Sequence, residues 1–357
     1  FKAFQTELSP PDNTASSTAA VALAVPSSAN PTTPKTSVAT VQPHDDPSDQ
    51  ARVPAWWLFP AALLGAALIL AGSGPTDRNG DSALLEGDIG TLRFIADLLE
   101  KQGISSLRYD KLGSGETALG DYDIEDIADL GFNTFVDAAS DGLDYLAGQP
   151  GVDPERLFVV GHSDGAVVAL ALATAKEGAR VSALALLEPL SVRLLDLLTT
   201  QIHRQLDAVV GAGQLPVELA DELRVALADA VESLRSEGTV PDDLPEPLQN
   251  AGLVHANAKA LAEEDALDPV ALVAALPAGM PVLTSCSDKD IQVIPADVAA
   301  LDAALSHTAL TSVRMRNANF VLKDIGDEQS TGADYVAPLP YSAEFSEPFT
   351  AWVRSFS

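Results

Sequence analysis

The chain has 357 residues, of which 46% are hydrophobic, and its formal net charge is −30, from 51 acidic and 21 basic side chains. This length allows one large domain, or one domain with a second inserted into it, around a sizeable core. An acidic surface repels phosphate backbones and anionic membranes, which argues against nucleic acid as a partner. The charge fits either a solubilising surface or a salt-adapted one, and the sequence does not separate the two.

The single cysteine, Cys286, rules out an intramolecular disulfide. It ends an apolar stretch, where buried packing is expected rather than a second nucleophile. The chain begins at Phe1, and no basic segment precedes an apolar run, so no intact signal peptide is expected. We expect a processed product, and this favours a secreted or periplasmic location over a cytoplasmic one. Nothing in the sequence indicates the oligomeric state.

Residues 1–52 are rich in Ala, Ser, Thr and Pro and predict a flexible segment, in which Ala20–Val25 could form a short strand. The following run, Val53–Thr76, carries no charge and is long enough to span a bilayer. A proline, a glycine and the closing GSGP interrupt this run, and no basic anchor follows it. These interruptions favour a buried strand at Ala66–Ala71 and argue against membrane association.

After this run the chain alternates strands and helices, which is typical of an α/β protein with a mostly parallel central sheet. The further expected strands are Ser105–Tyr109, Leu157–Val160, Ala183–Leu187, Pro281–Ser285 and Ser312–Met315. The expected flanking helices are Leu84–Gln102, Ile124–Ala147, Ala166–Ala175, Ala296–Leu305 and Ala343–Ser355.

Residues 191–276 interrupt the alternation, because they contain amphipathic helical patterns and no convincing strand. An all-helical block inserted into an α/β alternation is typical of a lid or cap. The expected organisation is therefore a first core part over residues 53–190, a helical cap over residues 191–276 and a second core part over residues 277–357.

The main motif is Gly161-His162-Ser163-Asp164-Gly165. G-x-S-x-G is a weak pattern by itself, but here it follows the apolar run LFVV and opens the helical run AVVALALA. In that strand–turn–helix setting the tight turn raises the Ser163 hydroxyl above the sheet as a nucleophile, and the Asp164 amide faces a developing oxyanion. The alternative is an ordinary glycine turn.

A glycine-rich loop, Gly72-Ser73-Gly74-Pro75, follows the first expected strand. Such a loop can supply the second amide of an oxyanion hole, and Ser73 is the candidate. Alone, it could also be a phosphate-binding turn or a plain loop, but it lacks the Lys-Ser/Thr of a P-loop and the spacing of a dinucleotide fingerprint. No cofactor is expected, and no metal, since no His/Cys/Asp cluster has ligand spacing.

A third loop, SDKDIQV, follows the expected strand at residues 281–285. The acid of a Ser-Asp-His triad belongs on a loop that leaves a late strand. Asp288 and Asp290 both fit this position, although an Asp-Lys-Asp loop can also be a solvated turn.

Four segments, GSGPTDRNG, RYDKLGSG, GHSDGA and SDKDIQV, together resemble the α/β-hydrolase superfamily in its bacterial esterase and S33-peptidase-like branch with a helical cap. The resemblance extends from about residue 55 to residue 357 and has the four motifs in order. It implies an α/β-hydrolase fold and a serine carboxylesterase that acts on a small-molecule ester through an acyl-enzyme.

The resemblance also assigns roles to individual residues. Ser163 becomes the nucleophile, and the Ser73 and Asp164 amides become the oxyanion hole. Asp290, which precedes Ile-Gln-Val, becomes the triad acid in place of Asp288. The residues it implies as supporting are Gly72, Gly74, Asp77, Arg78 and His162.

The chain departs from this family at the general base. The family has a segment like Asn-His-Val-Leu-Lys, whose histidine is the base, whereas residues 319–323 here read NFVLK and place Phe320 at that position. A phenyl ring can neither accept nor donate a proton in catalysis. Because loss of one triad member lowers kcat by roughly 10⁴- to 10⁶-fold, we expect a disabled or strongly impaired esterase.

None of the five histidines is expected to replace the missing base. His162 should point away from the Ser163 hydroxyl on a sharp turn, and His44 lies in the flexible segment. His203 and His255 lie in or beside the expected cap, and His307 lies about 13 residues before the base position.

Two other functions stay open from the sequence. The first is a non-catalytic homologue that binds a small ligand, and the second is a relative that cleaves amides or exchanges acyl groups at the same site. The Leu, Val and Ala content of the expected cap favours an apolar acyl or alcohol part in the substrate.

Overall fold

The computed structural model of the protein describes residues 64–175 and 180–356, so the expected flexible segment and its strand at Ala20–Val25 lie outside the described residues. A six-stranded sheet forms the centre, in the order β2-β1-β3-β4-β5-β6, and all neighbouring strands are parallel. The strands are β1 (Leu64–Leu70), β2 (Ser105–Arg108), β3 (Val152–His162), β4 (Val181–Leu187), β5 (Pro281–Ser287) and β6 (Ala309–Met315). The predicted α/β class and the predicted strands are confirmed.

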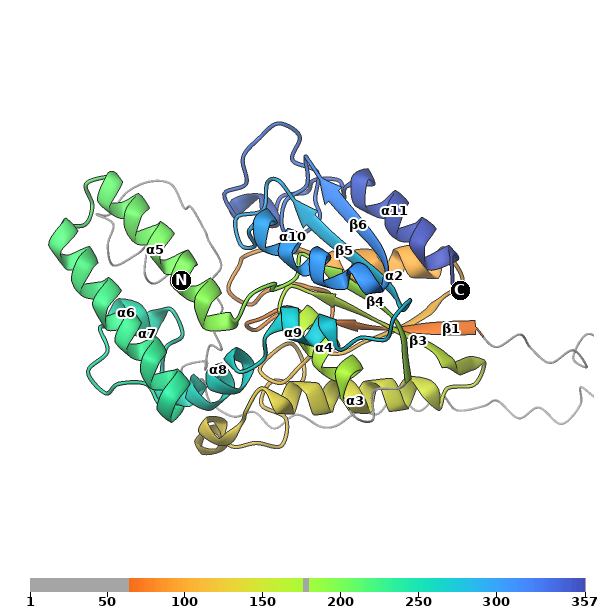
Figure 1. The fold of residues 1–357 in the computed structure, drawn as a ribbon, viewed down its shortest axis with the longest axis horizontal. Helices are drawn as coiled ribbons and strands as arrows, with labels where there is room; N and C mark the ends of the chain where they lie inside the picture. The colour runs from red at the N-terminus through yellow and green to blue at the C-terminus, as the bar shows by residue number, and fades with distance from the viewer. Residues whose placement is uncertain (1–63, 176–179, 357) are drawn as a thin grey trace, which may run out of the picture.

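Helices cover both faces of the sheet (Figure 1). α2 (Thr91–Glu100) and α11 (Ala343–Arg354) pack on one face, and the other face carries α3 (Asn133–Ala147), α4 (Gly165–Thr174), α9 (Pro269–Ala274) and α10 (Pro295–Ala304). Along β1, Ala66 and Leu68 face the α3 side while Ala67 and Ile69 face the α2 side. Because both faces are buried, the central strands are continuous apolar runs, which explains why the sequence predicts them well.

Two predicted helices differ from the observed ones. The helix predicted over Leu84–Gln102 begins at Thr91, because the Asp81 carboxylate accepts hydrogen bonds from the amides of Ile89 and Gly90 at 2.6 and 2.8 Å and fixes a loop there. The apolar residues of this loop pack against Tyr335 instead of extending the helix.

The helix predicted over Ile124–Ala147 is divided in two. Ile124–Asp129 is a short 3₁₀ helix, whose capping box joins Asp123 and Asp126. The chain is extended at Leu130, and α3 begins at Asn133. The spacing of apolar residues continues across this break, so the pattern alone did not reveal it.

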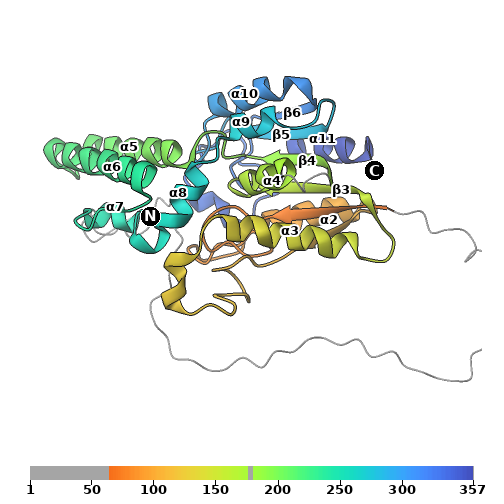
Figure 2. The same cartoon turned by 60° about the horizontal axis from the view of Figure 1, so that its bottom comes forward.

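Every regular element between β4 and β5 is a helix, in agreement with the sequence pattern. After α5 (Leu194–Gly211) and α6 (Val217–Glu237) come α7 (Glu246–Asn250), a 3₁₀ turn at His255–Asn257, α8 (Ala258–Asp265) and α9. We call residues 191–276 the helical insertion; its standing as a separate cap domain stays a prediction. Figures 1 and 2 show α5–α8 beyond the end of the sheet at which the strands finish.

A buried carboxylate ties the helical insertion together. Asp265 is 1% exposed and pairs with Arg193 at 2.6 Å and with Arg235 at 2.9 Å. It also accepts a hydrogen bond from the Leu195 amide at 2.9 Å. These contacts join α8 to the start of α5 and the end of α6.

In the part of the chain that the structure describes, no helix is long and apolar enough to cross a bilayer. Within the uncharged run Val53–Thr76, the described residues form β1 and the loop that follows it, in agreement with the strand interpretation.

Candidate active site

Ser163 lies at the sharp turn between β3 and α4, with a φ of 56°. A positive φ is uncommon for a residue with a side chain, and such strain concentrates at functional sites. The flanking glycines are required by space: a Cβ at Gly161 would lie 2.2 Å from the Gly165 carbonyl oxygen, and a Cβ at Gly165 would lie 2.6 Å from the Leu70 carbonyl oxygen. This is the geometry expected of a nucleophile elbow.

The glycine-rich loop after β1 lies directly against Ser163. A Cβ at Gly72 would be 3.1 Å from the Ser163 Cβ, and both residues line one cavity of about 90 Å³. Among the described residues, neither the Ser73 amide nor the Asp164 amide has a hydrogen-bond acceptor. Unpaired amides beside a nucleophile can donate to an oxygen on which negative charge develops.

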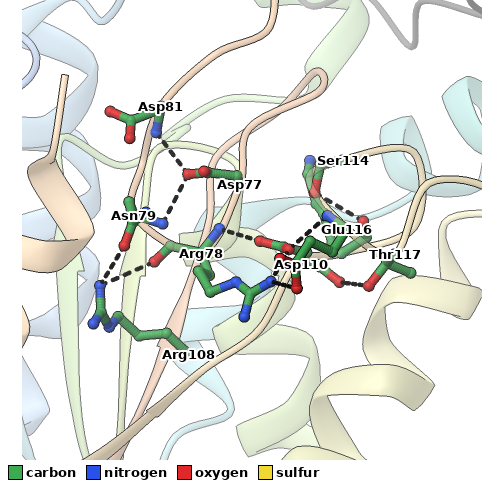
Figure 3. Close-up of polar contacts among 10 residues, drawn as sticks. Asp77, Arg78, Asn79, Asp81, Arg108, Asp110, Ser114, Glu116 and Thr117 are labelled. Atoms are coloured by element: carbon green, nitrogen blue, oxygen red, sulfur yellow. Dashed lines mark hydrogen bonds and ion pairs between the residues drawn. The ribbon is translucent and has the colours of Figure 1, made fainter. Parts of the chain in front are cut away.

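Asp77 and Arg78, both predicted as supporting residues, hold the continuation of this loop (Figure 3). Asp77 Oδ1 accepts hydrogen bonds from the amides of Asn79 and Asp81 at 2.8 and 2.9 Å. The Asn79 side chain and the Arg78 carbonyl oxygen in turn accept from Arg108, at the end of β2. The loop is therefore joined to the neighbouring strand.

Asp110, just after β2, is the centre of this network. Its carboxylate accepts from the Arg78 amide at 2.7 Å, from the Arg78 guanidinium at 2.6 Å and from the Glu116 amide at 2.8 Å (Figure 3). Burial opposes ionisation, but these hydrogen bonds outweigh it and hold the pKa of Asp110 below its ordinary value. Asp110 was absent from the candidate residues, although it lies within the quoted motif RYDKLGSG.

Asp290 lies on the loop after β5, where the sequence placed the triad acid. Its Oδ1 accepts hydrogen bonds from the amides of Gln292 and Val293 at 2.6 and 3.1 Å. Asp290 is partly exposed as a residue, but its Oδ2 is buried and burial raises the pKa of the carboxyl to about 6. The competing Asp288 points elsewhere, since it is exposed and pairs with Arg314 at 2.6 Å.

Glu188, at the end of β4, is a site residue that the sequence reasoning missed. Its fully buried carboxyl accepts hydrogen bonds from the Ser285 hydroxyl at 3.2 Å and the Ser287 amide at 3.1 Å. Burial and the neighbouring Asp290 carboxyl raise the pKa of Glu188 well above its ordinary value, which favours the protonated form of Glu188. In the sequence, the feature that could have indicated Glu188 is its position as a single acidic residue directly after the apolar strand VSALALL.

Phe320 stands where the resemblance expects the base. Its ring lies 4.7 Å from the His162 ring and 6.0 Å from the Tyr335 ring, and it lines the same cavity as Ser163. It also packs against the apolar cluster of Cys286, Val293 and Val298. Among the described residues, none accepts a hydrogen bond from the Ser163 hydroxyl.

The other histidines offer no evident replacement. Burial lowers the pKa of His162 to about 4, so its ring is neutral near pH 7, and Nε2 donates to the Phe320 carbonyl oxygen at 2.9 Å. His203 lies on α5, His255 beside Asp242, and His307 between two backbone carbonyls. None of these three lines the cavity of Ser163. His44 lies outside the described residues.

A second, larger cavity of about 270 Å³ also adjoins the glycine-rich loop, and Gly74 lines both cavities. Its walls are mostly small or apolar, from the loop at residues 112–119, from Phe135 and from the helical insertion at Ala256 and Ala260.

Comparisons with known proteins agree with this architecture. A sequence model described as the alpha/beta hydrolase family matches residues 85–323. The polyketide transferase ATR5 of Stachybotrys chlorohalonatus is 31% identical over 130 residues, which are 36% of this chain and 39% of that protein. The chain thus matches less than half the length of this curated relative.

Solved structures of esterases are also similar, at 14% identity. Esterase Pf2001 of Pyrococcus furiosus has a TM-score of 0.44, with 82% of this chain and 83% of that chain covered. Est1E of Butyrivibrio proteoclasticus with bound ferulic acid has a TM-score of 0.45, with 82% and 88% covered. Because the family match extends over more than half of the sequence and includes Ser163, Asp290 and Phe320, the chain belongs to the alpha/beta hydrolase family.

Proposed function

We propose that the protein is a serine carboxylesterase scaffold in which Ser163 is the nucleophile and Asp290 the triad acid. The observation that carries the proposal is the strained backbone of Ser163, with a φ of 56°, beside the two unpaired amides of Ser73 and Asp164. These amides would donate to the carbonyl oxygen of an ester as it becomes an oxyanion.

Such a site would cleave an ester in two steps, acylation of Ser163 and hydrolysis of the acyl-enzyme. The Ser163 oxygen attacks the ester carbonyl carbon, and its proton passes through a base to the departing alcohol as the carbon–oxygen bond breaks. Water then attacks the acyl-enzyme, which releases a carboxylic acid and restores the Ser163 hydroxyl. Both steps need a group that accepts and returns one proton.

Phe320 interrupts this proton transfer in the proposed mechanism. The side chain lines the cavity of Ser163 and packs against Val293, whose amide donates to Asp290. A histidine at this position would therefore lie between the nucleophile and the acid. With phenylalanine there, an oxyanion hole and substrate binding alone would give roughly 10³-fold acceleration over water.

The apolar cavity beside the glycine-rich loop supports an aliphatic or aromatic part in the substrate. A dry cavity of roughly 150 Å³ accommodates benzene, so the cavity of about 270 Å³ has room for roughly ten carbon atoms. We assign the acyl or alcohol part of the ester to this cavity. The helical insertion would act as the cap, because Leu197 and Gln201 of α5 line the cavity of Ser163.

The test is p-nitrophenyl butyrate hydrolysis by the protein, by Phe320→His and by Phe320→Ala. The alanine variant is the matched control, because it removes the ring without adding a base. We expect Phe320→His to exceed both others by about 10⁴-fold or more in kcat. Equal rates for the three proteins would overturn the proposed triad, and so would inactivity of a folded Phe320→His toward esters of all chain lengths.

A second candidate function is the binding of a small apolar ligand without turnover. The packing of Phe320 between His162 and Tyr335 favours it, since an aromatic wall suits binding better than proton transfer. This candidate predicts that decanol raises the melting temperature of the protein, and that a fluorophosphonate leaves the mass of Ser163 peptides unchanged. A mass increase on Ser163 would contradict it.

A further inference from the structure

Lys111, three residues after β2, makes a hydrogen bond that the proposed mechanism does not use. Its Nζ donates to the Gly72 carbonyl oxygen at 2.6 Å, and the ammonium group also lies 5.5 Å from the centre of the Phe135 ring. Burial lowers the pKa of Lys111, while the nearby Asp164 and Glu264 carboxyls oppose that shift. A lysine enclosed in this way is held in one place, unlike a lysine at the surface.

One of the two carboxyls near Lys111 is that of Asp164, the residue that follows Ser163. Asp164 Oδ1 and Glu264 Oε1 are buried, and neither has a hydrogen-bond partner among residues 64–175 and 180–356. Burial and the Asp164 charge raise the pKa of Glu264 well above its ordinary value, so Glu264 is the member that keeps the proton. The Lys111 ammonium group lies near two carboxyls, those of Asp164 and of Glu264 on α8.

The Gly72–Ser73 peptide bond links the hydrogen bond from Lys111 to the orientation of the Ser73 amide. A trans peptide is planar, and its carbonyl oxygen and amide hydrogen point in opposite directions. Lys111 holds the Gly72 carbonyl oxygen on one side of the peptide, so the Ser73 amide hydrogen is directed to the other side. Gly72 lies against Ser163, and Ser73 lines the Ser163 cavity.

We propose that Lys111 is a positioning residue that orients the Ser73 amide toward the substrate oxyanion by holding the Gly72 carbonyl oxygen. The inference rests on the proposed function, because it assigns a task to the oxyanion hole of that same site. Lys111 also lies near the carboxyl of Asp164, the residue that carries the second oxyanion amide.

A purely structural role for Lys111 would be to balance the buried charge of Asp164, and two variants separate the roles. Lys111→Met removes the donor to Gly72 and leaves Asp164 without its cation. The double variant Lys111→Met/Asp164→Asn removes the donor and the buried charge together, so it folds without an unpaired carboxylate. If charge balance is the whole role, the double variant recovers; if positioning is the role, it does not.

Lys259 provides a matched control. Its Nζ also donates to a backbone carbonyl oxygen at 2.6 Å, that of Asp129, but at an exposed position in the helical insertion. Lys259→Met therefore removes the same kind of contact away from Ser163.

The kinetic experiment uses the Phe320→His protein and p-nitrophenyl butyrate. We expect Lys111→Met and the double variant to lower kcat about 100-fold, which is the loss typical of one missing oxyanion donor, with KM changed less than about threefold. Lys259→Met should leave both constants unchanged. Recovery of kcat in the double variant would overturn the proposal.

Crystal structures of the original chain and of the double variant provide a readout that needs no turnover. We expect the Gly72–Ser73 peptide to rotate or to occupy more than one orientation when Lys111 is absent. A peptide that keeps its orientation would overturn the proposal even if kcat falls. If Phe320→His proves inactive, the proposed function fails, and the peptide orientation still decides whether Lys111 holds the Gly72 carbonyl oxygen.

Discussion

Two regions flank Ser163. In the first, which we call the charged side, Arg78 and Lys111 hold the glycine-rich loop. In the second, which we call the phenyl side, Phe320 lines the Ser163 cavity near the carboxyls of Glu188 and Asp290.

The charged side has cations for its acids, since Arg78 pairs with Asp110 and Lys111 lies beside Asp164. On the phenyl side, no lysine or arginine of the described residues pairs with Glu188 or Asp290, and burial raises the pKa of both carboxyls. Burial also raises the pKa of Glu264 on the charged side, so the two sides differ in the ion pair of Arg78 with Asp110, which has no counterpart at Glu188 and Asp290 among the described residues.

On the phenyl side, the side chains of Asn319 and Lys323 hold the backbone around residue 320. Asn319 Oδ1 accepts hydrogen bonds from the amides of Val321 and Lys323 at 3.1 and 2.9 Å. Lys323 Nζ in turn donates to the Tyr335 carbonyl oxygen at 2.6 Å. Because neighbouring residues hold this loop, exchange of the ring at position 320 should change the chemistry of the site and leave its backbone in place.

The largest expected effect tests the acid on the phenyl side. In the Phe320→His protein, Asp290→Asn should lower kcat by roughly 10⁴-fold, because the restored histidine loses the carboxylate that fixes its tautomer. Steady-state hydrolysis of p-nitrophenyl butyrate measures this loss. Asp288→Asn is the control, since Asp288 pairs with Arg314 at the surface, and it should change kcat less than about twofold. A greater loss for Asp288→Asn would reverse the assignment of the acid.

The second effect concerns the turn that both sides share. Gly165→Ala should lower the free energy of unfolding by about 3 kcal/mol or more, because its Cβ would lie 2.6 and 2.7 Å from the carbonyl oxygens of Leu70 and Ala71. Urea unfolding measures the change. Gly211→Ala, at the end of α5 with no atom near the new Cβ, should stabilise by roughly 0.5–1 kcal/mol. A stable Gly165→Ala would show that the turn tolerates a side chain.

The sequence predicted the elements whose local pattern carries the information. Parallel strands buried on both faces, such as Ala183–Leu187 within β4, are unbroken apolar runs, and G-x-S-x-G records a turn with no room for flanking side chains. The start of α2 was missed because the apolar residues before it pack on Tyr335, which is distant in sequence.

The missed site residues have the same cause. Glu188 gains its role only when β5 brings Asp290 beside it, and Lys111 only when the loop after β1 presents the Gly72 carbonyl oxygen. In sequence each is an isolated charge beside an apolar stretch, a pattern that many surface residues share. Pairs of acids formed by different strands are visible only in three dimensions.

The third expected effect is a pH dependence of the stability that Glu188 and Asp290 contribute on the phenyl side. Asp290 and Glu188 have folded-state pKa values above their unfolded ones, so their contributions to stability are complete at low pH; that of Asp290 is lost as pH rises through about 6, and that of Glu188 as pH rises through its own raised pKa. Glu188→Gln retains a donor to Asp290 and removes one titration. We expect the free energy of unfolding of Glu188→Gln, relative to the original chain, to improve by about 1–3 kcal/mol between pH 5 and pH 8. Denaturation at both pH values measures this, and a constant difference would refute the raised pKa of Glu188.

The smallest expected effect concerns Arg78 on the charged side, which pairs with one buried carboxylate and one exposed carboxylate. The Asp110 side chain is 3% exposed and that of Glu116 is 88% exposed, although both lie within 2.7 Å of the guanidinium. Glu116→Gln should change the free energy of unfolding by less than about 0.5 kcal/mol, because water screens an exposed pair. The Glu116 amide, which donates to Asp110 at 2.8 Å, stays in place in this variant. A loss above about 1 kcal/mol in thermal unfolding would mean that the Glu116 side chain, and not its amide, holds the loop.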